Sequence, residues 1–349
     1  MNTRITQHYV ALDGLRGLAA ISVVLLHVLI YFKIEFKVFY THLAVDFFFL
    51  LSGFVIAHAY DKKLMHGMSI YEFMKVRMIR LYPLIIVGVL LGTAIFIVNA
   101  IIFKDVTASE IIVAFASALL LVPTTAMAHL RSWSYPLNGP LWSLSFEIII
   151  NFLYVLAFPY LTKARLYIVA LTGALLLTMA AYLNDGLNAG FSLNDFYLGF
   201  VRVLYPFTIG IIIKRYIIDK IATGFLGLLS APILLAVLFL PGKEHWSVEL
   251  ISILVVFPVI LIFAAKLPEM PTLDKVWKPL GTLSYPLYVT HFPFVVAMSN
   301  LVKKFHLSVV QAEILASICF VLTIIFAHFI NRYYDVPFRN FLNLRLKPA

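Results

Sequence analysis

Two side chains capable of chemistry lie eleven positions apart in an apolar segment near the N-terminus. The segment LDGLRGLAAISVVLLHV, residues 12–28, carries Arg16 at one end and His27 near the other. Eleven residues make about three helical turns, so both side chains share one face, roughly 16 Å apart. Taken singly, Arg16 is explained as a membrane-boundary residue and His27 as a hydrogen-bonded interior histidine. Together they indicate a stripe facing a bundle interior or a wet cavity, because ionisable groups within a bilayer are costly.

Three further ionisable residues interrupt other apolar segments. Asp46 lies in AVDFFFLLSGFVI, Glu147 in NGPLWSLSFEIIINFLY and His291 in SYPLYVTHFPF. A carboxylate beside an imidazole orients the ring and favours its protonated form. We therefore predict that Asp46 or Glu147 orients His27 in catalysis, and that His291 is the next histidine to consider. The alternative is a set of interhelical hydrogen bonds that only hold helices together.

A pair of arginines marks a candidate anion site. In YEFMKVRMIRLYPL, residues 71–84, Arg77 and Arg80 are three positions apart and therefore neighbours on one helical face. Two guanidinium groups at this spacing, aligned with Arg16, can hold phosphate groups bidentately. The alternative is that they only set membrane topology. With His27 deeper in the same bundle, they indicate an anionic cytosolic cofactor whose reactive end reaches inward.

The composition requires these residues to be positioned by membrane helices. Hydrophobic residues make up 62% of the chain and charged residues 13%, whereas a soluble domain is about half apolar and a quarter charged. The single cysteine, Cys319, excludes an intrachain disulfide framework, and we expect no metal. The net charge of +10 does not indicate nucleic acid, because membrane proteins concentrate lysine and arginine in cytoplasmic loops. The N-terminus does not read as a cleavable signal peptide.

The apolar runs predict an all-α integral membrane protein with about ten transmembrane helices. A span needs about 20 mainly apolar residues. The candidate spans are 17–33, 43–60, 81–103, 141–161, 166–183, 196–213, 222–240, 248–265, 282–302 and 309–331. A further run, 110–122, is short and ends before Pro123. Counting it as a span would place Lys163 to Lys220 outside, so the positive-inside rule favours an interfacial or re-entrant helix there and both termini in the cytoplasm. We expect residues 1–349 to form one membrane-embedded domain with no appended soluble domain.

Several motifs resemble those of the membrane acyltransferase family 3, which includes bacterial O-antigen and exopolysaccharide O-acetylases. The motifs follow the family order along essentially the whole chain. They are the Arg16-x10-His27 pattern, VDFFFLLSGFVI, Arg77-x-x-Arg80, PLWSLSFE, SYPLYVTH and the terminal YYDVPFR. The resemblance implies transfer of an acyl group, usually acetyl, from cytosolic acyl-CoA to a hydroxyl of a cell-envelope or exported glycan, or of a lipid-linked glycan, at the outer face. It also implies a multi-pass protein that is embedded in the lipid bilayer of the bacterial inner membrane and modifies polysaccharides.

The resemblance also implies roles for individual residues. The essential histidine of the family maps to His27, its essential arginine to Arg16 and its RxxR pair to Arg77 and Arg80 as acyl-CoA ligands. Asp335 departs from the family, which usually has Glu two residues before the proline of the terminal motif; the shorter side chain leaves its role open. Further candidate site residues within the motifs are His291, Trp142, Ser52 and Asp335.

The expected chemistry combines these assignments. Coenzyme A is a polyanion that cannot cross a bilayer, so its phosphates should stay with the arginines while the pantetheine arm brings the thioester towards His27. His27 then either removes the proton of the acceptor hydroxyl or takes the acyl group first as an acyl-imidazole; the sequence leaves both routes open. Other classes that fit are a transporter or flippase of lipid-linked glycans and a structural membrane subunit. The acceptor, the acyl length and the oligomeric state are open.

Overall fold

The described residues of the computed structural model, 8–35, 40–130, 132–241 and 244–345, are helices joined by loops, without a strand among them. The longer helices are α1 (Val10–Phe32), α2 (Ala44–Met65), α3 (Ile70–Phe103), α4 (Ala108–Leu120), α5 (Leu141–Ala157), α6 (Lys163–Leu183), α7 (Leu198–Ile212), α8 (Ser230–Leu238), α9 (Trp246–Ile251), α10 (Phe257–Ala265), α11 (Pro271–Lys304), α12 (Val309–Ile330) and α13 (Val336–Arg345). Short π-helical segments follow α7 (Ile213–Ile217), join α9 to α10 (Ser252–Val256) and join α12 to α13 (Asn331–Asp335). The all-α prediction is confirmed for these residues.

Seven helical segments of the described residues are long and apolar enough to cross a membrane. They are Val10–Phe32, Thr41–Met65, Ile70–Phe103, Leu141–Tyr160, Lys163–Leu183, Trp246–Ala265 and Val309–Arg345. The predicted count of about ten spans is therefore not confirmed. The short run predicted between the third and fourth spans is present as α4, which is only 13 residues long.

Three of the predicted spans fall short of this measure for identifiable reasons. The run at 222–240 forms only a short helical segment, Gly224–Leu238. α7 carries the buried Arg202, and α11 carries three prolines together with serine, threonine, tyrosine and histidine. Every residue of α11 from 286 to 293 is buried, so this stretch is enclosed by protein on all sides. A helix enclosed by other helices can hold polar residues that a lipid-facing helix cannot.

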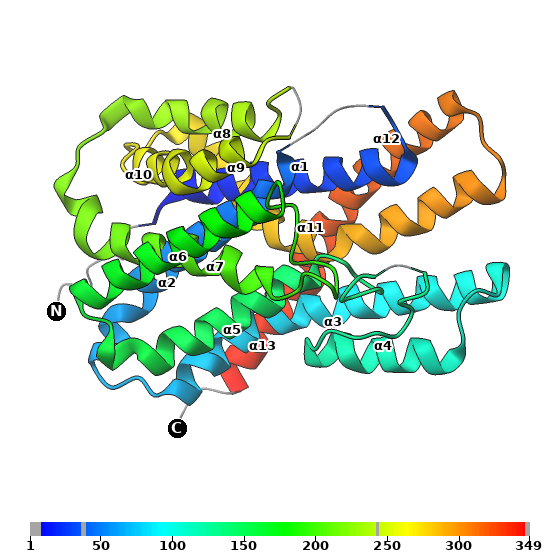
Figure 1. Cartoon of the computed structure of the whole chain (residues 1–349), viewed down its shortest axis with the longest axis horizontal. Coiled ribbons are helices and arrows are strands. Elements are labelled where there is room, and N and C mark those ends of the chain that lie inside the picture. The colour runs from blue at the N-terminus through cyan, green and yellow to red at the C-terminus, as the bar shows by residue number, and fades with distance from the viewer. Residues whose placement is uncertain (1–7, 36–39, 131, 242–243, 346–349) are drawn as a thin grey trace.

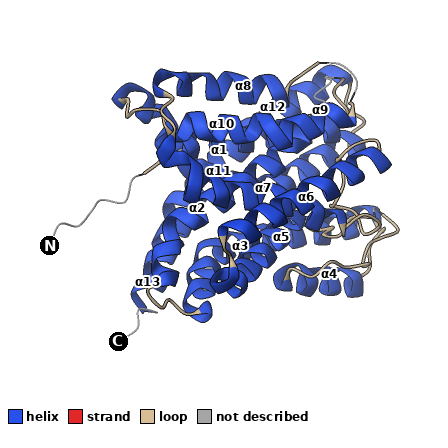
Figure 2. Cartoon of the chain, turned by 60° about the vertical axis from the view of Figure 1, so that its left-hand side comes forward, coloured by secondary structure: helices blue, strands red, loops and turns tan. Residues whose placement is uncertain are grey.

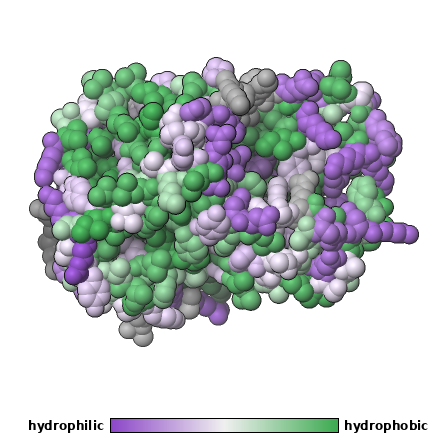
Figure 3. All heavy atoms as spheres, in the orientation of Figure 1, coloured by the Kyte–Doolittle hydropathy of each residue, from purple (hydrophilic) through white to green (hydrophobic). Residues whose placement is uncertain are grey.

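The helices run mostly along the long axis of the molecule, with α1 between the α8–α10 group and α11 (Figure 1). The view turned by 60° also places α1 beside α10 and α11, near the middle of the bundle (Figure 2). On the surface, hydrophobic residues cover broad areas of the bundle, and hydrophilic residues gather most plainly at the right-hand end (Figure 3). This distribution fits a bundle whose flank contacts lipid and whose ends contact water.

Glycine lets α1 and α11 pack with their backbones almost touching. A Cβ on Gly17 would lie 2.5 Å from the carbonyl oxygen of Leu280, and a Cβ on Gly281 would lie 2.5 Å from Cβ of Asp13. Such distances leave no room for a side chain at either position. Because the two helices approach this closely, the polar side chains of α1 are brought directly against those of α11.

Candidate active site

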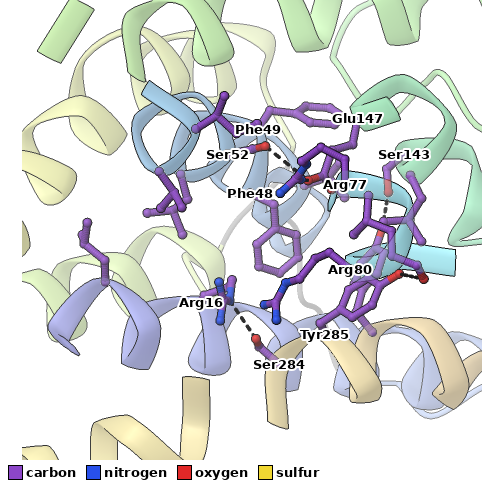
Figure 4. Close-up of a pocket in the computed structure, with 18 of the residues that line it drawn as sticks. Arg16, Phe48, Phe49, Ser52, Arg77, Arg80, Ser143, Glu147, Ser284 and Tyr285 are labelled. Atoms are coloured by element: carbon purple, nitrogen blue, oxygen red, sulfur yellow. Dashed lines mark hydrogen bonds and ion pairs between the residues drawn. The ribbon is translucent and has the colours of Figure 1, made fainter. Parts of the chain in front are cut away.

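Arg16, Arg77 and Arg80 line one cavity of about 150 Å³, which we call the arginine cavity. Its wall is built from α1, α2, α3, α5 and α11, and Figure 4 shows the labelled side chains converging on it. The lining residues that carry the argument below are Asp13, Arg16, Phe48, Ser52, Arg77, Arg80, Glu147, Ser284, Tyr285 and Tyr288. The predicted convergence of the three arginines is therefore present in the structure.

Arg16 is held in place by α11 and by its own helix. Its Nε donates to Oγ of Ser284 at 2.8 Å, and its Nη2 donates to the carbonyl oxygen of Gly281 at 3.0 Å. Nη2 also lies 3.1 Å from Oδ1 of Asp13, one turn earlier in α1. These contacts fix the guanidinium group at the cavity wall, where Figure 4 shows its bond to Ser284.

Arg77 pairs with Glu147, which the sequence assigned to a different partner. Nη2 of Arg77 lies 2.7 Å from Oε1 of Glu147, and Oγ of Ser52 donates to the same oxygen at 3.2 Å. Among the described residues, the hydrogen-bond partners of His27 are Val23 and His291, and Glu147 is not one of them. The predicted pairing of Glu147 with His27 is thus corrected, because helix packing brings Glu147 to the arginine cavity instead.

Arg80 faces the same cavity without a direct ion pair among the described residues; the carboxylate of Asp335 interacts with it electrostatically but is ion-paired with Arg339. No hydrogen bond or ion pair joins its guanidinium group to any residue in the described ranges, and Figure 4 shows it pointing towards Arg16. Three guanidinium groups line this cavity against the two carboxylates of Asp13 and Glu147. An excess of positive charge in a partly enclosed space favours an anionic ligand that accepts several hydrogen bonds.

His27 lines a second, larger cavity of about 500 Å³, the histidine cavity. Aromatic rings form much of its wall, and a few polar side chains reach it. The lining residues include Tyr31, Trp133, Trp142, Phe191 and Tyr288 among the rings, and His42, Asn188, Arg202 and Glu244 among the polar groups. Desolvation raises the pKa of the Glu244 carboxyl above its usual value, and the nearby His42 opposes this shift. Such a mixed wall suits a ligand with both apolar faces and hydroxyl groups.

The contacts of His27 leave one ring nitrogen open. Its Nδ1 lies 2.9 Å from the carbonyl oxygen of Val23 and 3.2 Å from Nε2 of His291. Its Nε2 has no hydrogen-bond partner among the described residues, and the side chain is only partly buried where it lines the cavity. The open nitrogen is therefore the one available to a reacting group.

Asp46, the other predicted partner of His27, forms a buried ion pair with Arg202. Nη2 of Arg202 lies 2.6 Å from Oδ2 of Asp46, and Nε donates to Oδ1 at 3.2 Å. Nη1 of the same guanidinium donates to the carbonyl oxygen of Ala189 at 2.6 Å. Both charged side chains are essentially inaccessible, at 1% and 0% exposed. The predicted contact of Asp46 with His27 is therefore corrected. The carboxylate pairs instead with the guanidinium group of Arg202, because a buried charge needs a counter-ion.

The two cavities are neighbours that share part of their walls. Val45 and Tyr288 line both. The hydroxyl of Tyr288 is hydrogen-bonded to Oγ of Ser143 at 2.6 Å, and the ring of Phe48 packs edge-on against the Tyr288 ring. A narrow side-chain partition therefore separates the arginine cavity from the histidine cavity.

The remaining candidates from the sequence occupy three different places. Ser52 lines the arginine cavity, and Trp142 lines the histidine cavity with its ring 5.1 Å from the guanidinium carbon of Arg202. Asp335 lines neither cavity and lies 2.7 Å from Nη2 of Arg339 in an ion pair one helical turn apart. The sequence reasoning did not single out Arg202 or Tyr288. An arginine within a predicted span was the available signal for the first.

Comparisons with known proteins agree with this architecture. A family model described as an acyltransferase domain matches residues 9–332. The chain is also similar to a protein of Rhizobium radiobacter named "Protein 2 in picA locus", with 34% identity over 185 residues, covering 50% of this chain and 95% of the relative. No solved structure matches.

Proposed function

The chain belongs to acyltransferase family 3, and we propose from this premise that it is an integral membrane O-acyltransferase of the bacterial inner membrane. The donor is cytosolic acyl-CoA, most simply acetyl-CoA, and the acceptor is a hydroxyl of a cell-envelope or exported glycan. One observation carries the proposal. A cavity rich in guanidinium groups adjoins a cavity that holds an imidazole with an open nitrogen, and the two share Val45 and Tyr288.

The arginine cavity has the chemistry of a donor site. Phosphate groups bind guanidinium groups through paired, charge-assisted hydrogen bonds. The guanidinium group of Arg80 makes no hydrogen bond or ion pair with any described residue, and Arg16 is pre-oriented by Ser284. The phosphates of acyl-CoA would remain with these arginines, and the thioester would pass the partition towards His27. Binding by groups already held in position loses little conformational entropy.

The histidine cavity has the chemistry of an acceptor site. Sugars present hydroxyl groups at their edges and C–H groups on their faces, which complement polar side chains and aromatic rings respectively. The wall supplies Trp133, Trp142 and Tyr31 as rings, and Asn188 and Glu244 as hydrogen-bonding groups. A flippase of lipid-linked glycans would also need a site for sugar and could use the arginines for the phosphate linkage of its lipid, but it would not need to bind CoA.

The reaction balances with His27 as the proton carrier. Nε2 takes the proton of the acceptor hydroxyl while the oxygen attacks the thioester carbonyl carbon. The tetrahedral intermediate collapses, the C–S bond breaks, and the leaving thiolate takes the proton from the imidazolium to give free CoA. An acyl-imidazole route uses the same Nε2 as the nucleophile. Both routes require the imidazole hydrogen to be on Nδ1, so that Nε2 has a free lone pair. Nδ1 lies within hydrogen-bond distance of the carbonyl oxygen of Val23, which can only accept.

Replacing Arg80 tests the donor site. We expect Arg80→Ala to weaken acyl-CoA binding by roughly 10- to 150-fold, the loss for one charge-assisted contact of about 1.5–3 kcal/mol. Arg80→Lys should recover part of the affinity, because lysine keeps the charge without the planar fork. Calorimetry on purified protein measures both, and CoA should raise the melting temperature of the unsubstituted protein.

The matched control for this test is Arg165→Ala. Arg165 is an exposed arginine of α6 that lines neither cavity, and its guanidinium group donates to the carbonyl oxygen of Tyr160. The Arg165→Ala variant should bind acyl-CoA with the affinity of the unsubstituted protein. Equal affinity in Arg80→Ala and the unsubstituted protein, or no stabilisation by CoA, would contradict the donor site and favour the flippase.

Thiol labelling in intact cells tests the sidedness. We place both termini in the cytoplasm, which puts the exposed Asn188 of the histidine cavity on the outer face of the inner membrane and Lys214 on the cytoplasmic face. A membrane-impermeant thiol reagent should label a cysteine at Asn188 and not one at Lys214. The unsubstituted protein is the control, because Cys319 is buried. Labelling at Lys214 alone would reverse the proposed orientation.

A further inference from the structure

His291 is buried beside His27 and does not reach either cavity. Its side chain is 0% exposed, whereas His27 lines the histidine cavity. The two ring centroids are 5.0 Å apart, and Nε2 of His291 lies 3.2 Å from Nδ1 of His27. His291 is fully buried and cannot contact a ligand, but it is within hydrogen-bond distance of His27. It can therefore affect the reaction only through His27.

The hydrogen bonds determine which nitrogen of each ring carries the proton. A carbonyl oxygen only accepts, so Nδ1 of His27 donates to Val23 and Nδ1 of His291 donates to the carbonyl oxygen of Leu287 at 3.0 Å. A neutral imidazole has one donor and one acceptor, so Nε2 of His291 is an acceptor. It accepts from Nδ1 of His27, which therefore shares its hydrogen between Val23 and His291. Nε2 of His27 is left as the basic nitrogen facing the cavity.

We propose that His291 is the positioning residue of the reaction: it fixes the tautomer and orientation of His27, and its Nε2 accepts a hydrogen bond from Nδ1–H when His27 becomes an imidazolium. This inference rests on the proposed function. In many hydrolases a carboxylate performs this task. Here neither Asp46 nor Glu147 is available, because each pairs with an arginine.

The surroundings support a neutral partner. The other titratable or charged side chains at the histidine cavity are Tyr31, His42, Arg202, Glu244 and Tyr288. On α1 itself, Arg16 lies about three turns away. Val23, Phe292 and His291 supply the described polar and ring contacts of His27. None of the three residues in contact with His27 is a carboxylate, and of the two side chains only His291 can accept a hydrogen bond from Nδ1.

Two substitutions at position 291 separate positioning from packing. His291→Phe keeps the ring volume and removes the acceptor; we expect kcat to fall by roughly 10- to 100-fold, the loss found when the hydrogen-bond partner that orients a metal-bound histidine is removed. Acyl-CoA affinity should not change. His291→Gln restores an acceptor oxygen and should recover part of kcat. Thr290→Val is the matched control, because Thr290 is equally buried on α11 and its hydroxyl bonds only to the carbonyl oxygen of Pro286.

Nitrogen-15 spectra of histidine-labelled protein give a readout that packing alone would not move. The signal of His27 is assigned as the one lost in His27→Gln. It should show a protonated Nδ1 in the unsubstituted protein and a mixture of tautomers in His291→Phe. Normal kcat in folded His291→Phe, or an unchanged His27 tautomer with equal losses in the Phe and Gln variants, would overturn the assignment. Failure of the unsubstituted protein to bind acyl-CoA would instead refute the proposed function, and the spectra would still report on the histidine pair.

Discussion

His27→Gln should abolish acyl transfer while leaving acyl-CoA affinity intact. Glutamine keeps a polar side chain of similar length but has no basic nitrogen, so neither proton removal nor acyl-imidazole formation can occur. Loss of a general base costs roughly 10²- to 10⁴-fold in rate. Loss of a nucleophile costs more, since the covalent route disappears with it. The phosphates should bind normally because the arginine cavity does not include His27.

The measurement is transfer from radiolabelled acetyl-CoA by purified protein, with calorimetric binding of acetyl-CoA on the same sample. His66→Gln is the control, because His66 is exposed at the end of α2 and bonds only to the carbonyl oxygen of Lys62. The control should retain full activity. Near-normal turnover in folded His27→Gln would remove His27 from the reaction and, with it, the positioning role proposed for His291.

The arginine cavity could be predicted because local helix geometry determines much of it. Arg77 and Arg80 share a face at a spacing of three, and Arg16 lies at the same end of its own helix. The contact between His27 and His291 could not be predicted in this way. It joins residues 264 positions apart and depends on the close approach of α1 and α11 at Gly17 and Gly281. Spacing along one helix does not determine which face of another helix it meets.

Asp46 and Glu147 pair with guanidinium groups rather than with the imidazole, because positions within separate helices do not determine which side chains meet across the bundle. Asp46 and Glu147 were both matched to the imidazole, although each has a guanidinium group within 2.7 Å. Arg202 was the signal that could have corrected this. An arginine inside a predicted span requires a partner, and an acid within another span is the natural one. The predicted count of about ten spans is not confirmed for a related reason: helices such as α11 are enclosed by protein and carry polar residues, so length and apolar composition do not identify them as spans.

Asp46→Asn should destabilise the fold strongly, because it leaves Arg202 charged and buried without a counter-ion. Removing one partner of a buried ion pair costs about 3–5 kcal/mol. The remaining bonds of Arg202, to the carbonyl oxygens of Ala189 and His42, do not neutralise its charge. We expect a clear fall in melting temperature in detergent. Asp274→Asn is the control: Asp274 pairs with an exposed lysine at 3.4 Å, and its loss should cost no more than about 1 kcal/mol.

The double variant Asp46→Leu with Arg202→Met distinguishes a structural role for Asp46 from a catalytic one. Replacing both charges with apolar side chains leaves no unpaired charge, so the double variant should be more stable than Asp46→Asn. A double-mutant cycle of the unfolding free energies of Asp46→Leu, Arg202→Met and the double variant should show strong coupling. If Asp46 serves mainly to neutralise Arg202, transfer per folded molecule will fall far less in Asp46→Asn than in His27→Gln. If Asp46 orients the imidazole, turnover will be lost while the melting temperature is unchanged. That second pattern would contradict the ion pair as the reason for a carboxylate at this position, because a residue that stabilises a buried charge cannot be replaced without a cost in stability.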